Sequence, residues 1–129
     1  MSRGLGDVYK RQEVLNRSFA LTAFVADRDR ILAVSGAGRR ELADRSISLP
    51  LEKLMDARKP YQNEGTADRA VLPCEGSPRV LLCAVPIIAA GDVTGAVGLL
   101  TEDRTAVPDD AQRKALSVAA AFLARQMEE

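Results

Sequence analysis

Short apolar runs separated by polar turns fill the first third of the chain. Residues 13–21 carry apolar side chains three and four positions apart, which indicates the end of a helix. Residues 23–26 and 31–34 are apolar and flank a charged tetrapeptide, and this pattern predicts a β-hairpin. The Ser-Gly-Ala-Gly segment at 35–38 then ends the second strand.

Two helices are predicted in the middle of the chain. Residues 39–44 suit one or two helical turns, and residues 46–58 show a longer amphipathic pattern. Ser48 is expected to cap the longer helix, because Pro50 follows in its first turn and prolines are tolerated there. The polar stretch 61–69 is expected to be a loop over the open side of the domain.

The second half of the chain predicts three strands and a final helix. The strands are residues 71–74, 80–88 and 93–101, and the run 80–88 is apolar on both faces, as in a central strand. Gly95 and Gly98 offer no side chain for packing, so another part of the protein is expected to approach them closely.

The helix predicted for residues 108–128 has an unusually broad apolar face. Asp109 and Asp110 suit its electropositive N-terminus. Alanines widen the face beyond one stripe: Ala111, Ala115, Ala119, Ala120, Ala121 and Ala124. Two interpretations stay open, because such a helix can be buried within its own monomer or can pack on the sheet and on a partner helix together.

This order of elements predicts an α+β fold in three layers. Five antiparallel strands form the central sheet, with the terminal helices on one face and the middle helices and the loop on the other. We divide the chain into a tail at 1–12, the end of a helix at 13–22 and one domain at 23–129.

Composition and charge exclude several functions for this chain. Eighteen basic and eighteen acidic residues give a net charge of zero, so the chain lacks the positive field that would attract DNA or an anionic membrane. There is no histidine, which excludes histidine-based nucleophilic triads and histidine-ligated metal sites. We predict no cofactor, no metal site and no membrane contact, and two isolated cysteines favour a cytoplasmic location.

Residues 1–12 do not fit the rest of the sequence. The segment Asp-Val-Tyr-Lys-Arg-Gln at 7–12 resembles the translation of an adapter used to prepare DNA libraries. We therefore set residues 1–12 aside from the fold, as one would a fusion scar, with a natural flexible tail as the alternative. On this interpretation the chain is truncated and its natural sequence begins near Glu13.

Several motifs together carry a family resemblance. They are Asp27-Arg28-Asp29, Ala33-Val34-Ser35-Gly36, and residues 45–48, 86–92, 95–97 and 119–128. In this order and spacing they resemble the C-terminal domain of the stage V sporulation protein T family of transcription regulators, from about Glu13 to the end. The resemblance implies a GAF fold that assembles oligomers through its terminal helices and senses an unidentified small molecule. It also implies an upstream AbrB-like DNA-binding domain, which this chain lacks, so DNA contact is expected only through that missing part.

The candidate ligand-binding residues are Ser35, Gly36 and Arg39. Ser35 and Gly36 close a strand and could offer backbone amides, and Arg39, with Arg40 beside it, could bind a carboxylate or phosphate. The alternative for the first two is an ordinary strand-to-helix turn, and for the arginines a solvated helix face.

The two cysteines suggest an enzymatic alternative. Some GAF proteins reduce free methionine sulfoxide with thiols near the pocket, which requires an accessible thiolate of lowered pKa. Cys83 lies in an apolar strand and Cys74 lies beside Glu75, and neither setting favours a thiolate. We name no catalytic residue, because Asp27, Asp29 and the acids at 109–110 have structural roles.

Our leading hypothesis is a non-enzymatic sensing module that forms homo-oligomers through its terminal helices. A free-standing thiol-dependent methionine sulfoxide reductase is the alternative. A third hypothesis is an interaction module that keeps the fold but has a collapsed pocket.

Overall fold

The structure is a computed structural model and describes residues 21–128. The helix predicted for 13–21 and the boundary at residue 12 lie outside this range, apart from Leu21 itself. Those two features therefore stay predictions.

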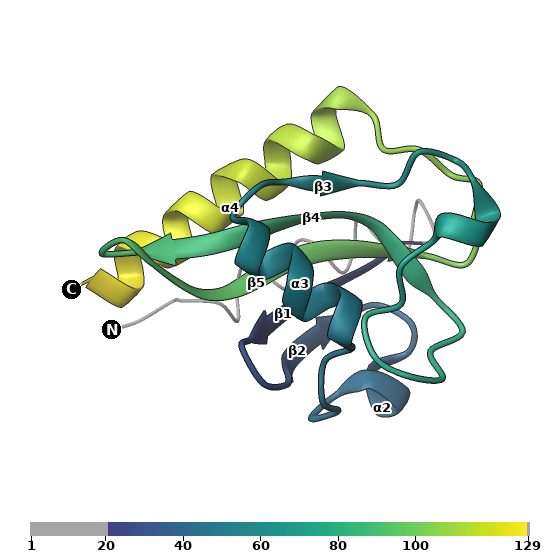
Figure 1. Cartoon of the computed structure of the whole chain (residues 1–129), viewed down its shortest axis with the longest axis horizontal. Helices are drawn as coiled ribbons and strands as arrows, with labels where there is room; N and C mark the ends of the chain where they lie inside the picture. The colour runs from purple at the N-terminus through teal and green to yellow at the C-terminus, as the bar shows by residue number, and fades with distance from the viewer. Residues whose placement is uncertain (1–20, 129) are drawn as a thin grey trace.

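Five strands form one antiparallel sheet in the order β2-β1-β5-β4-β3 (Figure 1). The strands are β1 (Thr22–Asp27), β2 (Ile31–Ser35), β3 (Tyr61–Gln62), β4 (Val80–Ala89) and β5 (Asp92–Thr101). The predicted β1–β2 hairpin is confirmed, and the long strands β4 and β5 occupy the centre of the sheet beside β1. The three-layer α+β prediction is also confirmed.

The strand predicted at 71–74 is wrong, and the fifth strand is β3. Tyr61 and Gln62 pair with Ala84 and Cys83 of β4, within the stretch that was predicted to be a loop. Residues 71–74 do not form a strand because their carbonyl groups have other donors. The Ser48 hydroxyl donates to the Leu72 carbonyl at 2.6 Å, and the Ser48 amide donates to the Pro73 carbonyl at 2.9 Å.

The helices on one side of the sheet are short. They are α2 (Arg39–Leu42) and α3 (Leu49–Ala57), and one 3₁₀ turn, η1 (Ala67–Arg69), follows β3 in the chain. The predicted cap of α3 is confirmed, because the Ser48 hydroxyl oxygen accepts from the Leu51 amide at 3.1 Å. This hydroxyl serves α3 and residue 72 together, so it fixes the helix to the loop that follows the sheet edge.

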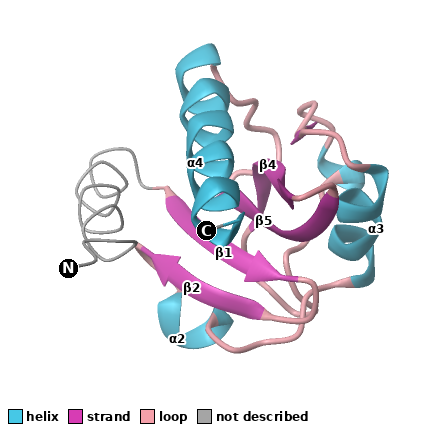
Figure 2. Ribbon diagram, turned by 90° about the vertical axis from the view of Figure 1, so that its left-hand side faces the viewer, coloured by secondary structure: helices cyan, strands magenta, loops and turns pink. Residues whose placement is uncertain are grey.

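Helix α4 (Asp110–Glu128) lies on the opposite face (Figure 2). Its first turn is closed by a reciprocal pair, in which the Gln112 amide donates to the Asp109 carboxylate at 2.7 Å and the Asp109 amide donates to the Gln112 side chain at 2.9 Å. The buried helix residues Leu116, Ala120, Leu123 and Ala124 pack on the sheet.

The sheet therefore separates two apolar cores. The core on the α4 side contains Ala23, Val25, Val97 and Leu99 of the central strands. The core on the α3 side contains Phe24, Ala26, Ala96 and Leu100 from the same strands, together with the buried α3 residues Leu51 and Met55. Successive residues alternate between the two faces, as a strand requires.

The close approach predicted at Gly95 and Gly98 is confirmed. A Cβ atom on Gly95 would lie 2.0 Å from the Ala26 carbonyl oxygen of β1. A Cβ on Gly98 would lie 2.5 Å from the ring of Phe24, which is fully buried. Glycine at these two positions lets β1 and its phenylalanine settle against β5.

Candidate functional site

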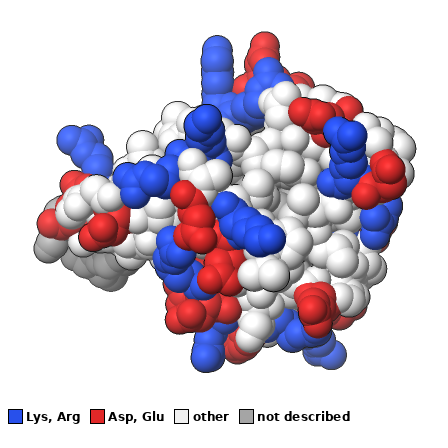
Figure 3. Space-filling model, in the orientation of Figure 1, with Lys and Arg blue, Asp and Glu red and all other residues white. Residues whose placement is uncertain are grey.

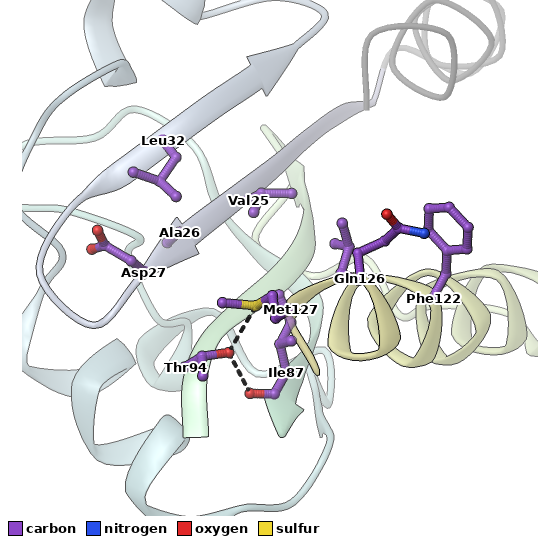
Figure 4. A pocket seen from close by; sticks show the side chains of 10 residues that line it. Val25, Ala26, Asp27, Leu32, Ile87, Thr94, Phe122, Gln126 and Met127 are labelled. Carbon is purple, nitrogen blue, oxygen red and sulfur yellow. Dashed lines mark hydrogen bonds between the residues drawn. The ribbon is translucent and has the colours of Figure 1, made fainter. Parts of the chain in front are cut away.

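An apolar groove lies beside the C-terminal end of α4 (Figure 4). Its volume is about 410 Å³. The lining side chains come from β1, β2, β4, β5 and α4: Val25, Ala26, Asp27, Leu32, Ile87, Thr94, Phe122, Leu123, Gln126 and Met127. We call this feature the α4 groove.

Most polar groups of the α4 groove have structural partners. The Thr94 hydroxyl lies 3.1 Å from the Ile87 carbonyl and 3.3 Å from the Met127 sulfur. One oxygen of Asp27 accepts the amides of Asp29 and Arg30 at 2.7 Å and so holds the β1–β2 turn. The groove therefore suits the burial of apolar groups rather than chemistry on a substrate.

An exposed apolar stripe on α4 adjoins this groove. It consists of Ala111, Ala115, Val118 and Phe122, and we call it the outer stripe. Val118 is 69% exposed and Phe122 is 43% exposed, and Phe122 belongs to both the stripe and the groove. The spacing of four, three and four residues places all four side chains along one side of the helix.

Little free space remains between α3 and the sheet. A space of only about 10 Å³ remains there, next to Leu51, Leu54 and Met55 of α3 and the ring of Tyr61. This is about the volume that a single water molecule needs. Side chains of the α3-side core thus fill the space between α3 and the sheet in this structure.

A second open hollow lies at the sheet edge beyond β3. Its volume is about 400 Å³, and its lining comes from one segment of the chain: Pro60, Tyr61, Gln62, Asn63, Glu64, Thr66 and Arg69. We call it the loop hollow. Tyr61 lines this hollow and also the closed space under α3, so one side chain separates the two.

The predicted ligand residues Ser35, Gly36 and Arg39 lie together where β2 ends, and none of them lines the hollows described above. Ser35 is buried at the last position of β2. Gly36 has a φ of 100°, and a Cβ there would lie 2.9 Å from the Leu21 carbonyl oxygen. The Arg39 guanidinium donates to the Val34 carbonyl at 3.2 Å. These contacts give the segment a role in ending the strand.

The sequence predicts a loop over the open side at 61–69, but it does not mark the residues of the loop hollow as ligand-binding residues. Asn63 is 1% exposed, and its side-chain amide donates to the carbonyls of Arg104 and Ala106 at 2.8 Å. Both partners lie more than forty residues away in the chain. A polar residue between Gln62 and Glu64 gives no sign in the sequence that it will be buried.

Both cysteines are buried and free. Burial raises the pKa of the Cys83 thiol to about 12. The nearby Arg113 lowers this pKa and Asp109 raises it, both by less than burial does. Burial also raises the pKa of Cys74, although the nearby Arg45 lowers it in part. Neither residue has the accessible, low-pKa thiol that a thiol-dependent reductase needs.

We expect the two native thiols to react with a maleimide at pH 8 roughly 100-fold more slowly than the thiols of the urea-unfolded chain, because neither native thiol is exposed or ionised. In the unfolded chain a cysteine ionises near pH 9, whereas folded Cys83 stays protonated to about pH 12. The folded state therefore loses stability as pH rises from 9 toward 12. Mass spectrometry of labelled peptides measures the rates, and rapid labelling of native Cys83 would contradict this burial.

Charges of both signs are interspersed on the face seen in Figure 3. The Arg79 guanidinium pairs with two carboxylates, at 3.5 Å from that of Glu41 and 3.1 Å from that of Glu102. Among residues 21–128, acidic and cysteine side chains do not gather into a group that could hold a metal ion. None of the helices in this range is long and apolar enough to cross a membrane.

Comparison with solved structures gives the class of the fold. The GAF domain of A. aeolicus Nlh2 in an inactive state superposes with a TM-score of 0.66 and 14% identity, over 100% of this chain and 88% of that one. The cofactor-binding GAF domain of the nutrient sensor CodY from Clostridium difficile superposes with a TM-score of 0.61 and 11% identity. This match covers 89% of this chain and 80% of the CodY domain. The chain therefore has a GAF fold.

Sequence comparison gives the family. The family model for the C-terminal domain of stage V sporulation protein T, a transcription factor, matches residues 5–128. Stage V sporulation protein T of Bacillus subtilis (strain 168) is 33% identical over 126 residues, which are 97% of this chain and 70% of that protein. The chain belongs to the stage V sporulation protein T C-terminal family. The family match begins at residue 5, inside the segment that sequence analysis sets aside, and the adapter interpretation stays a prediction.

Proposed function

We propose that this GAF domain is the sensing and self-association module of a sporulation transcription regulator. On this proposal the outer stripe and the α4 groove pair with a second copy, and a small molecule bound on the opposite side of the sheet biases that pairing. The regulator acts in the cytoplasm and contacts DNA through a separate domain upstream, because this chain has no net positive charge. The role is non-enzymatic.

The exposed apolar side chains of α4 carry the proposal. Helix α4 already buries one face against the sheet, yet Val118 and Phe122 stay exposed on another. Their four-three-four spacing with Ala111 and Ala115 is that of a helix seam that packs on a partner helix. The alanines let two helices approach closely, and the larger residues provide the area that is buried.

The α4 groove extends the same surface toward β2. Leu32 is 53% exposed and Met127 is 56% exposed at its rim. Because Phe122 belongs to both features, a helix laid along the outer stripe would cover the groove as well. A two-fold axis would make the surface self-complementary, so a second copy supplies the helix and the apolar side chains together.

One turn connects the two helical layers of the domain. Ala90 and Gly91, which join β4 to β5, both have positive φ, as a two-residue hairpin turn requires. The Ala90 amide donates to the Glu128 carboxylate of α4 at 2.8 Å. The Arg58 side chain, at the end of α3, donates to the Gly91 carbonyl at 2.9 Å. A shift of α3 on ligand binding would reach the end of α4 through this turn.

A second candidate function is favoured by the closed space of about 10 Å³ under α3. A domain that associates with partners and holds no small molecule needs no cavity there. This candidate keeps the self-association surface and removes the sensing step, so ligand binding separates the two.

The association half of the proposal is tested by placing charge on the outer stripe. We expect the full chain to sediment as a dimer at about 50 µM, and Val118→Glu and Phe122→Glu each to weaken dimerisation by at least about 100-fold, because a carboxylate in an apolar helix seam stays unpaired. Ser117→Glu is the control, since Ser117 is exposed about 100° around the helix from Val118.

Analytical ultracentrifugation over a concentration series measures the dimer dissociation constants, and circular dichroism verifies that each variant is folded. A wild-type chain that stays monomeric, or a Ser117→Glu variant that dissociates as strongly as the stripe variants, would overturn the assignment of this surface.

A further inference from the structure

We infer that the loop hollow is a binding site for a small zwitterion, a molecule that carries one carboxylate and one ammonium group. This inference deepens the sensing part of the proposed function and rests on it. It places the ligand at the edge of the sheet beyond β3, next to Asn63, Glu64 and Arg69, rather than under α3.

The wall of the loop hollow is fixed before any ligand arrives. The Asn63 amide donates to the Leu82 carbonyl of β4 at 2.9 Å, and its side chain donates to two further carbonyls, those of Arg104 and Ala106. The Arg113 guanidinium donates to the Gln62 side chain at 3.2 Å. A site held by such contacts loses little conformational entropy when it binds a small molecule.

Asn63 leaves one polar atom without a protein donor. Both hydrogens of its side-chain amide are used by the carbonyls of Arg104 and Ala106. Within residues 21–128 no group donates to its Oδ1. A buried carbonyl oxygen without a hydrogen bond is unfavourable, and Asn63 is 1% exposed in the wall of the hollow. Asn63 therefore shapes the wall of the hollow, and the ammonium group of the ligand is expected to pair with the exposed Glu64 carboxylate on its rim.

The rim carries one charge of each sign. Arg69 and Glu64 both line the hollow, and neither side chain forms a hydrogen bond or ion pair within the described residues. A guanidinium binds a carboxylate through two parallel hydrogen bonds. Burial raises the pKa of Tyr61, and the nearby Glu64 carboxylate raises it further, so the negative charge of Glu64 is felt inside the hollow. Opposite charges on one rim favour a ligand with both groups over a simple anion.

Size and neighbourhood restrict the rest of the ligand. A volume of about 400 Å³ is at the small end of the range for ligand pockets. The uncharged part of the molecule would lie against Pro60 and the ring of Tyr61. Tyr61 also lines the small space under α3, so contact with its ring is the route by which ligand binding would affect the position of α3.

The test is titration of the ¹⁵N-labelled full chain with α-, β- and γ-amino acids, including the twenty that occur in proteins. We expect at least one to shift the backbone amides of residues 61–69 in a saturable manner. The matched compounds that lack either the amino or the carboxyl group are expected to bind at least tenfold more weakly. Arg69→Gln and Glu64→Gln are each expected to weaken binding at least tenfold. Arg30→Gln, which changes an exposed arginine of the β1–β2 turn, is the control.

The outcomes separate this inference from the sensing proposal. If none of the amino acids shifts residues 61–69, or if carboxylates alone bind as well as zwitterions, the inference is overturned. If an amino acid instead shifts residues of the α4 groove or of α3, the inference fails while sensing survives. Unchanged spectra of the variants outside the loop show that they are folded.

Discussion

Replacing Gly95 with alanine is expected to prevent stable folding of the domain. The new Cβ would lie 2.0 Å from the Ala26 carbonyl oxygen and 3.1 Å from the Asp27 Cα. Both atoms are backbone of β1, which pairs with β5 across the centre of the sheet, so no side-chain rotation relieves the contact. We expect a loss of more than about 3 kcal/mol in the free energy of unfolding, beyond the usual range for overpacking.

Gly76→Ala is the matched control for this prediction. Gly76 has a φ of 78°, and no other atom lies within 4 Å of the place that a Cβ would take, so alanine there meets only the penalty of left-handed backbone, about 1–2 kcal/mol. Urea denaturation followed by circular dichroism measures both variants. A Gly95→Ala protein as stable as Gly76→Ala would contradict the packing of β1 on β5.

Phe24 and Gly98 are expected to behave as a coupled pair. Phe24→Ala removes a fully buried ring and is expected to destabilise the domain by about 3–5 kcal/mol. Gly98→Ala places a Cβ 2.5 Å from the same ring and 2.9 Å from the Cys83 carbonyl oxygen. Once the ring is absent, only the second contact remains, so Gly98→Ala costs at least about 1 kcal/mol less in the Phe24→Ala background.

A double-mutant cycle from urea denaturation measures this coupling. Because Phe24→Ala alone brings the domain close to its stability limit, a milder pair with Phe24→Leu serves where the first is unfolded. Strictly additive effects of the two substitutions would show that the glycine and the ring do not share space.

Much of the fold could be predicted from local sequence pattern. The β1–β2 hairpin, the cap at Ser48 and helix α4 depend on the order of apolar, turn and capping residues within a few positions. The strand predicted at 71–74 failed because the carbonyls at 72 and 73 bind Ser48, a contact across more than twenty residues. Strand β3 is only two residues long, too short to show an alternating pattern.

The hollows were harder to predict because each depends on distant segments. The loop hollow is lined by residues 60–69 alone, but Asn63 in its wall is held by the carbonyls of Arg104 and Ala106. The α4 groove forms where Leu32 of β2 comes near Phe122 and Met127 at the end of α4. The sequence pointed instead to Ser35, Gly36 and Arg39, a glycine-containing turn that is recognisable without knowledge of the tertiary structure.

The central claim is that the outer stripe of α4 packs against the same stripe of a second copy. Cross-linking of Val118→Cys tests it directly, because the two native cysteines are buried. Ser117→Cys is the control on the polar flank of the helix. With mild oxidant and about 50 µM protein, we expect Val118→Cys to form a disulfide-linked dimer at least tenfold faster than Ser117→Cys, since the thiols meet only in the paired helices. Equal rates for the two variants, or monomers alone, would contradict the claim.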